Sequence, residues 1–199
     1  MNNKKEIVLK YILVGESGVG KSTICEKYTT GIFNKNGIAQ TIGIEFYTSC
    51  CKIKESNVTM HIWDTAGQER FRSVTRNYYK DAIVAFIIFD LSDINTLKIN
   101  YWIDDIIKHC NKNIRIILVG NKLDMCNIGK HDRELFKNNY NFPYYEISAK
   151  NDTNKIDDMF SQVTKNICYD IASNKLSITK DFRGIVEKNT PQSKSKCCY

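Results

Sequence analysis

The chain has 199 residues, a formal net charge of +7 and an apolar fraction of 42%. This length suits one domain that is large enough to bury a core without disulfides or a structural metal. The basic residues are scattered rather than gathered in one run, so we expect a solvated surface with a mild basic bias and no nucleic-acid-binding site.

The eight cysteines form no CxxC pair, and no group of Cys and His has the spacing of a zinc site. The N-terminus carries no secretion signal, and the apolar residues 7–14 are too few to cross a membrane. We therefore expect a reducing compartment, in which most of the cysteines are small core residues.

Apolar runs rich in β-branched residues alternate along the chain with segments that favour helix. In chain order we expect strands at residues 7–14, 46–54, 58–63, 83–89, 114–119 and 144–147, and helices at residues 21–29, 95–110, 131–139 and 154–171. The second and third strands follow each other closely, which predicts a hairpin. The pattern predicts a doubly wound α/β domain over residues 1–172, with a mostly parallel sheet and one antiparallel strand. Residues 173–199 are polar and predict a flexible tail.

The segment GESGVGKS, from Gly15 to Ser22, fits the pattern GxxxxGK[ST] and lies between an expected strand and an expected helix. Its glycines allow backbone N–H groups to close around phosphates, and the helix N-terminus adds its positive end. Lys21 can reach the β- and γ-phosphates, and the Ser22 hydroxyl can bind Mg²⁺. The predicted phosphate-binding residues are Gly15, Glu16, Ser17, Gly18, Val19, Gly20, Lys21, Ser22 and Thr23. A glycine-rich turn without a ligand is the alternative, whereas the G-x-x-G-x-G spacing disfavours a dinucleotide fingerprint.

Two short motifs follow the last expected strands. In Asn121-Lys122-Leu123-Asp124, the carboxylate of Asp124 can accept hydrogen bonds from the N1–H and the amino group of guanine, a pair of donors that adenine lacks. Ser148-Ala149-Lys150 can present a backbone N–H to guanine O6. Together they predict GTP rather than ATP; an ATP-using kinase remains the alternative that substitution of Asp124 distinguishes.

The segment DTAGQ ends the second strand of the expected hairpin. Asp64 can hold Mg²⁺ through a water molecule, the Gly67 N–H can contact the γ-phosphate, and Gln68 can orient an attacking water. Thr41 precedes the hairpin and can bind Mg²⁺ while the γ-phosphate is present. The metal ligands expected are therefore Ser22, Thr41 and Asp64.

The elements GESGVGKS, Thr41, DTAGQ, NKLD and SAK, in this order, resemble the Ras superfamily of small GTPases. The segments IGIEF and WDTAGQERFRSVTRNYY and the two terminal cysteines resemble the Rab family in particular. The resemblance implies a Ras-like P-loop GTPase fold with a six-stranded sheet and five helices, and a base stacked on Phe33. It also implies GDP/GTP cycling with an exchange factor, a GTPase-activating protein, an escort protein with geranylgeranyl transferase and a GDP-dissociation inhibitor.

Catalysis of this kind needs positioning and charge neutralisation more than covalent chemistry. We expect Lys21 and the loop amides to stabilise charge, Gly67 to contact the phosphate and Gln68 to place the water. No arginine in the motifs is aimed at the phosphate, so slow intrinsic hydrolysis is expected. Effector proteins are expected to contact Ile42, Gly43, Ile44, Glu45, Phe46, Trp63, Phe71, Tyr78 and Tyr79. For Tyr78 and Tyr79, a place in the core is almost as good an interpretation.

The sequence departs from the family pattern in three places. The interval from Ser22 to Thr41 is one residue longer than is usual, and the interval between NKLD and SAK is about three residues shorter, which predicts a short helix at 131–139. Asp81 stands where glycine is common. A nucleotide-locked scaffold that binds GTP without cycling is the alternative function, although Thr41 and Gln68 argue against it.

The terminal residues Cys197 and Cys198 follow a linker with Lys194 and Lys196. They resemble a doubly geranylgeranylated terminus, since two lipid chains give a stable anchor and lysines attract anionic lipid. A pair of free thiols is the alternative. The resemblance implies a monomer at the cytoplasmic face of an intracellular membrane that exchanges with the cytosol.

Overall fold

A computed structural model describes residues 6–34 and 40–176 of the chain. Within these ranges, one sheet has the strand order β2-β3-β1-β4-β5-β6. The strands are β1 (Glu6–Val14), β2 (Ile44–Ile53), β3 (Ser56–Thr65), β4 (Val84–Asp90), β5 (Arg115–Asn121) and β6 (Tyr144–Glu146). Only β2 runs antiparallel, against β3, and the other pairs in the sheet are parallel. The predicted six-stranded α/β fold is confirmed.

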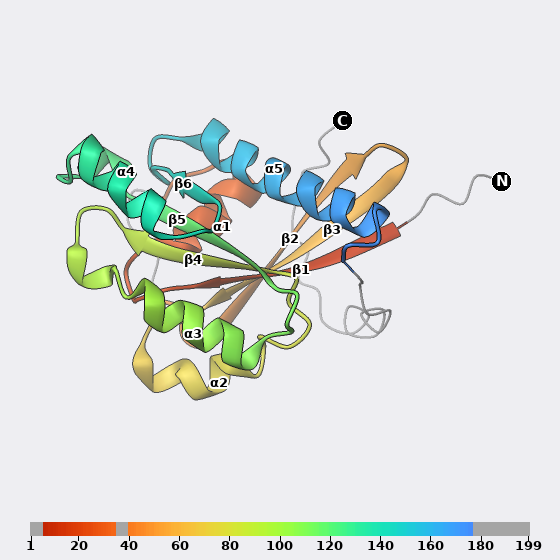
Figure 1. Ribbon diagram of the computed structural model, residues 1–199, viewed down its shortest axis with the longest axis horizontal. Helices are drawn as coiled ribbons and strands as arrows, with labels where there is room; N and C mark the ends of the chain where they lie inside the picture. The colour runs from red at the N-terminus through yellow and green to blue at the C-terminus, as the bar shows by residue number, and fades with distance from the viewer. Residues whose placement is uncertain (1–5, 35–39, 177–199) are drawn as a thin grey trace.

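Five α-helices accompany the sheet in the described ranges: α1 (Lys21–Thr30), α2 (Arg72–Arg76), α3 (Ile99–His109), α4 (Lys130–Asn139) and α5 (Thr153–Ala172). In Figure 1, α5 lies along one face of the sheet, while α2 and α3 lie along the other. The side chains of β4 alternate between the two layers of core, because successive residues of a strand point to opposite faces. Phe86 packs with α1 and α5, and Ile87 packs with α3.

The five helices confirm the number that the resemblance implied, but α2 was not assigned to any residues from the pattern. It has only five residues, too few for apolar periodicity to show. The expected start of the helix at 95–110 is also corrected, because a 3₁₀ turn, Ile94–Thr96, precedes α3 and ends before Ile99. The segment 131–139 forms α4, a helix of 10 residues.

The hairpin turn is tighter than predicted, since β2 ends at Ile53 and β3 begins at Ser56. Asp81, at the family's usual glycine position, has φ 61°. This left-handed conformation explains why glycine suits the position, since it has no Cβ to clash with the backbone.

Residues 173–176 are the part of the predicted tail that the structure describes, and Leu176 is 5% exposed against the core. Cys197, Cys198 and the other tail residues lie outside the described ranges. The six cysteines inside them are free, and only Cys25 among these six is fully buried. The other five are half-buried, and four of these pack against the edge of the core: Cys51, Cys110, Cys126 and Cys168. None of the described helices is long and apolar enough to cross a bilayer.

Candidate nucleotide-binding site

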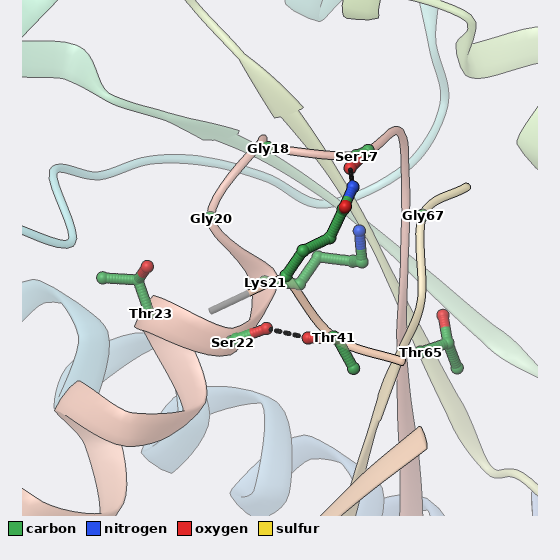
Figure 2. Close-up of a pocket in the computed structure, with 10 residues that line it drawn as sticks. Ser17, Gly18, Gly20, Lys21, Ser22, Thr23, Thr41, Thr65 and Gly67 are labelled. Carbon is green, nitrogen blue, oxygen red and sulfur yellow. Dashed lines mark hydrogen bonds between the residues drawn. The ribbon is translucent and has the colours of Figure 1, made fainter. Parts of the chain in front are cut away.

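The carboxyl ends of β1 and β3 meet at a pocket of about 280 Å³ (Figure 2). Ligands bind at this edge of the sheet in open α/β folds. The lining residues come from the phosphate loop, the start of α1, the segment before β2 and the end of β3: Ser17, Gly18, Gly20, Lys21, Ser22, Thr23, Gln40, Thr41, Thr65 and Gly67. Gln40 and Thr65 were not singled out from the sequence. The pocket therefore gathers three separate motifs around one space.

Lys21 is 5% exposed, and its ammonium group donates to the carbonyl oxygens of Gly15 at 3.0 Å and of Glu16 at 2.8 Å. Burial lowers the pKa of Lys21 to about 8, while the charges of Asp64 and Glu16 oppose this shift. A buried ammonium that faces a polar pocket gains from an anion, because added negative charge offsets the loss of hydration. The buried ammonium group of Lys21 therefore suits a phosphate ligand.

Ser22 and Thr41 line the pocket, and their hydroxyl groups converge on the buried carboxylate of Asp64. The Ser22 hydroxyl lies 2.5 Å from Asp64 Oδ2 and 2.7 Å from the Thr41 hydroxyl, and the Thr41 hydroxyl donates to the same carboxylate oxygen at 3.3 Å. Asp64 Oδ1 is buried and has no hydrogen-bond partner among the described residues. Burial raises the pKa of Asp64 to about 6, although the hydrogen bond from Ser22 and the charge of Lys21 oppose the shift.

These three side chains fit a magnesium ion. They offer only oxygen atoms, the donors that Mg²⁺ prefers, and they include one buried carboxylate whose second oxygen needs a partner. A cation beside Asp64 would favour its charged form and remove the cost of burying it. The geometry thus brings together the three ligands that the sequence predicted.

Gly67 lies against the phosphate loop. A Cβ added there would come within 2.5 Å of the carbonyl carbon and oxygen of Glu16 and of the Ser17 nitrogen, so the DTAGQ segment approaches the loop as closely as it does only because residue 67 is glycine. Gln68 follows, half-buried, and its side-chain oxygen accepts a hydrogen bond from the guanidinium of Arg70. Gln68 is therefore restrained by the hydrogen bond from Arg70 and by the close packing of the preceding residue, Gly67, on the phosphate loop.

Asn121 connects the phosphate loop with the SAK loop. Its amide nitrogen donates to the Val19 carbonyl at 2.9 Å, and its amide oxygen accepts from the Ala149 N–H at 3.0 Å. Gly20 packs against it, since a Cβ at Gly20 would lie 2.4 Å from the Asn121 side-chain nitrogen. Asn121 is 1% exposed, so it fixes the spacing between the loops that would hold the phosphates and the base.

Asp124 is exposed, and one of its carboxylate oxygens accepts a hydrogen bond of 2.5 Å from the Ser148 hydroxyl. The Ser148 N–H donates to Asp152, at the start of α5. The amides of Ser148 and Ala149 therefore both donate within the protein. A guanine O6 would have to share one of them or use the amide of Lys150, which is exposed.

Lys122 has φ 60° and its ammonium lies 2.7 Å from a carboxylate oxygen of Asp90, at the end of β4. Burial raises the pKa of Asp90, but hydrogen bonds from Lys122 and Ser92 outweigh it, so the net shift is downward. Asp90 was missed from the sequence, because no motif joins it to NKLD. Only the pairing of β4 with β5 places Asp90 opposite Asn121.

Phe46, Trp63 and Tyr78 form an aromatic surface in which the ring of Trp63 contacts the other two. The rings of Phe46 and Trp63 are 5.1 Å apart, and those of Trp63 and Tyr78 are 5.2 Å apart. Phe46 is 42% exposed and Tyr78 is 37% exposed. An exposed aromatic group of this kind is typical of the surfaces that bind proteins.

Tyr79 does not belong to that surface. It is 1% exposed and packs against α3. Burial raises the pKa of its hydroxyl group, and the negative charge of Asp105 adds to the shift. The expected partner contact at Tyr79 is corrected in this conformation, since a buried ring offers no surface to a partner.

The other expected partner contacts lie in the segment before β2, in the first residues of β2, and in the turn before α2. Ile42 is 82% exposed, and Gly43 accepts a hydrogen bond from the Ala66 N–H. Glu45 is exposed, whereas Ile44 and Phe71 are half-buried. Phe33, expected to stack on the base, is half-buried just after α1.

Comparison of the sequence with known proteins identifies the family of this chain. The profile of the Ras family matches residues 10–169. Ras-related protein SEC4 of Saccharomyces cerevisiae is 36% identical over 198 residues, which cover 96% of this chain and 91% of that protein. Ras-related protein Rab11A of Lotus japonicus is 38% identical over 184 residues, covering 90% of this chain and 80% of that protein.

GTP-binding protein ypt1 of Schizosaccharomyces pombe is 32% identical over an alignment of 208 residues that covers 100% of both chains. The matched residues contain the phosphate loop, Thr41, Asp64 and the NKLD and SAK segments. The chain therefore belongs to the Ras superfamily and is a small GTPase of the Rab family, an enzyme that hydrolyses GTP.

Proposed function

We propose that this GTPase cycles between GDP-bound and GTP-bound states and recruits effector proteins in intracellular vesicle and membrane traffic. The observation that carries the proposal is the meeting of Ser22, Thr41 and Asp64, within 2.5 to 3.3 Å of one another. These residues belong to the phosphate loop and to the two segments expected to respond to the γ-phosphate. A change at this one point can therefore loosen both segments together.

Each residue of the site has its own expected role in binding or hydrolysing GTP. Lys21 and the loop amides would bind the phosphates, and Ser22, Thr41 and Asp64 would hold Mg²⁺. Mg²⁺, when bound there, supplies positive charge to the phosphate oxygens. Gly67 lets the DTAGQ segment approach the γ-phosphate, and Gln68 would orient the attacking water. Asp124 would accept hydrogen bonds from guanine, with Asn121 fixing the distance between the two halves of the site.

Effectors would bind the aromatic surface of Phe46, Trp63 and Tyr78, together with the exposed segment at Ile42. Phe46 follows Thr41 by five positions, and Trp63 directly precedes Asp64 in β3. Release of Thr41 after hydrolysis would alter the edge of this surface, and so the affinity for effectors would follow the nucleotide.

The proposal extends to the membrane and to the regulators. Residues 1–172 would form the GTPase domain, and 173–199 a tail lipidated at Cys197 and Cys198. Two lipid chains would hold the protein at the cytoplasmic face of an intracellular membrane. An exchange factor, a GTPase-activating protein, a GDP-dissociation inhibitor and an escort protein with its geranylgeranyl transferase would act on it.

The test is single-turnover hydrolysis of GTP by the purified protein loaded with Mg²⁺, alongside Gln68→Leu. We expect slow turnover in the wild type and a loss of about 10-fold or more in the variant. Tight binding of GTP without turnover in either protein, even when a GTPase-activating protein is added, would instead support the nucleotide-locked scaffold.

A further inference from the structure

The side chain of Glu16, in the phosphate loop, binds two cations from different parts of the chain. Its Oε1 lies 3.0 Å from the guanidinium of Arg72, and its Oε2 lies 3.3 Å from the ammonium of Lys98. The Glu16 side chain is 17% exposed and that of Arg72 is 20% exposed, whereas that of Lys98 is 55% exposed. The pair with Arg72 is therefore the better shielded from water, and shielding strengthens an ion pair.

Arg72 is also held from a second side. Its guanidinium lies 4.6 Å from the ring centre of Tyr101 and 5.1 Å from that of Trp102, both on α3. Arginine suits this place because its planar group can stack on aromatic rings while its edge pairs with a carboxylate. Arg72 is the first residue of α2, so these contacts fix the start of that helix between the phosphate loop and α3.

Glu16 contacts both ends of the segment that carries Gln68. At one end, the Glu16 backbone packs so closely on Gly67 that a Cβ would not fit. At the other end, the Glu16 side chain binds Arg72. The segment 67–72 is thus fastened at each end to the same residue of the phosphate loop, with Gln68 between the two attachments.

We propose that Arg72 is a positioning residue for GTP hydrolysis, which acts through Glu16 to hold the Gln68 segment against the phosphate loop. This inference rests on the proposed role of Gln68. Arg72 does not line the pocket, since its NH2 group is bonded to Glu16 and its guanidinium lies over the rings of Tyr101 and Trp102. Its loss would change the rate of hydrolysis but leave the affinity for nucleotide intact.

A catalytic cation would behave differently. If the guanidinium of Arg72 stabilised the transferring phosphoryl group directly, then Glu16 would compete for it, and Glu16→Gln would speed hydrolysis. If Arg72 positions the Gln68 segment through Glu16, then Glu16→Gln slows hydrolysis. The sign of the change distinguishes the two roles.

The experiment uses the full chain, loaded with GTP and Mg²⁺, and measures single-turnover hydrolysis, nucleotide dissociation and hydrogen exchange over residues 67–76. We expect Arg72→Met, which keeps the aliphatic part of the side chain, to hydrolyse GTP about 10-fold more slowly, since a small misplacement of a reacting group costs up to roughly 10²-fold. Nucleotide dissociation is expected to stay within about twofold, and exchange over 67–76 to rise. Lys98→Met, which removes the other cation from Glu16, is the matched control and is expected to hydrolyse at the wild-type rate.

Two further variants complete the test. Arg72→Lys keeps the charge but not the planar group, and an intermediate rate is expected. The double variant Glu16→Gln/Arg72→Met is expected to be no slower than the slower single variant, because residues that act as a unit are not additive.

A wild-type rate in Arg72→Met, additive losses in the double variant, or faster hydrolysis in Glu16→Gln would overturn the inference while Gln68→Leu remains slow. A wild-type rate in Gln68→Leu would overturn both the inference and the proposed role of Gln68. The two failures are therefore distinguishable.

Discussion

The hydroxyl groups of Ser22 and Thr41 lie 2.7 Å apart, although 19 positions separate the two residues in sequence. Ser22 belongs to the first turn of α1, while Thr41 precedes β2. Their contact ties the segment before β2 to the base of the phosphate loop. Both hydroxyl groups also contact the same oxygen of Asp64.

Thr41→Val removes the hydroxyl and nearly preserves the shape of the side chain. Because Thr41 is expected to bind Mg²⁺ while the γ-phosphate is present, GTP should dissociate about 10-fold faster, as is usual when a metal-supporting group is lost. GDP dissociation should change less. The measurement is the release of labelled GTP and GDP in excess Mg²⁺. Thr48→Val, on β2, is the control, and equal effects of Thr41→Val on the two nucleotides would contradict the expected role.

Asp124→Asn exchanges a carboxylate for an amide at the predicted guanine contact. The amide can still accept the hydrogen bond from Ser148, so the loop should keep its shape. It cannot accept both guanine donors, and we expect the affinity for GTP to fall by roughly 10²-fold or more, with a shift toward xanthine nucleotides. Competition between XTP and GTP measures this shift. An unchanged preference for GTP would show that Asp124 does not recognise the base.

Tyr78 and Tyr79 are adjacent but should respond differently to substitution. Tyr79→Ala removes a ring that is 1% exposed and should lower the free energy of unfolding by about 3–5 kcal/mol. Tyr78→Ala removes an exposed ring that packs against Trp63 at a tilt of 38° and should cost about 1 kcal/mol. Urea unfolding of the two GDP-bound variants measures the difference. Similar losses in both would mean that Tyr78 is as much a core residue as Tyr79.

The ion pair of Asp90 with Lys122 predicts a pH dependence of stability. The pKa of Asp90 is lower in the folded protein than its ordinary value, so its carboxylate contributes stability above the unfolded pKa of about 3.9, and this contribution is lost as pH falls through the folded pKa. Asp90→Asn should lower the free energy of unfolding by about 1–2 kcal/mol at neutral pH. The difference between wild type and variant should shrink below about pH 4.

Chemical unfolding at several pH values, at a fixed nucleotide concentration, checks this expectation. Asp93→Asn is the control, since Asp93 is exposed and its side chain bonds only locally, to Asn95, in the described structure. A difference between wild type and Asp90→Asn that grows toward acid would contradict the sign.

The backbone at Asp81 gives a test by a pair of variants. Asp81→Gly and Asp81→Ala both remove the carboxylate, but only glycine adopts φ 61° without strain. We expect the Ala variant to be about 1 kcal/mol less stable than the Gly variant. Thermal unfolding under identical conditions measures the difference, and an Ala variant as stable as the Gly variant would mean that the backbone relaxes at this position.

Most of the fold could be predicted from local pattern. The alternation of apolar strands and segments that favour helix predicts the layers, and the short intervals between them restrict the topology. The segment from Gly15 to Ser22 predicts its own structure, because its glycines and the helix that follows act within a few residues. By contrast, α2 is too short for periodicity, and its first residue, Arg72, contacts Glu16 and α3, which are distant in sequence.

The sequence by itself determined the phosphate loop and predicted the side chains expected to bind Mg²⁺ and guanine, because each motif carries its chemistry in a few neighbouring positions. Only the tertiary structure decided how they meet. It buried Tyr79 but left Tyr78 exposed, and it paired Asp90 with Lys122. It also brought Arg72 into contact with Glu16, 56 positions away. Such contacts follow from strand order and helix packing, which place distant residues side by side, and no spacing within the sequence encodes them directly.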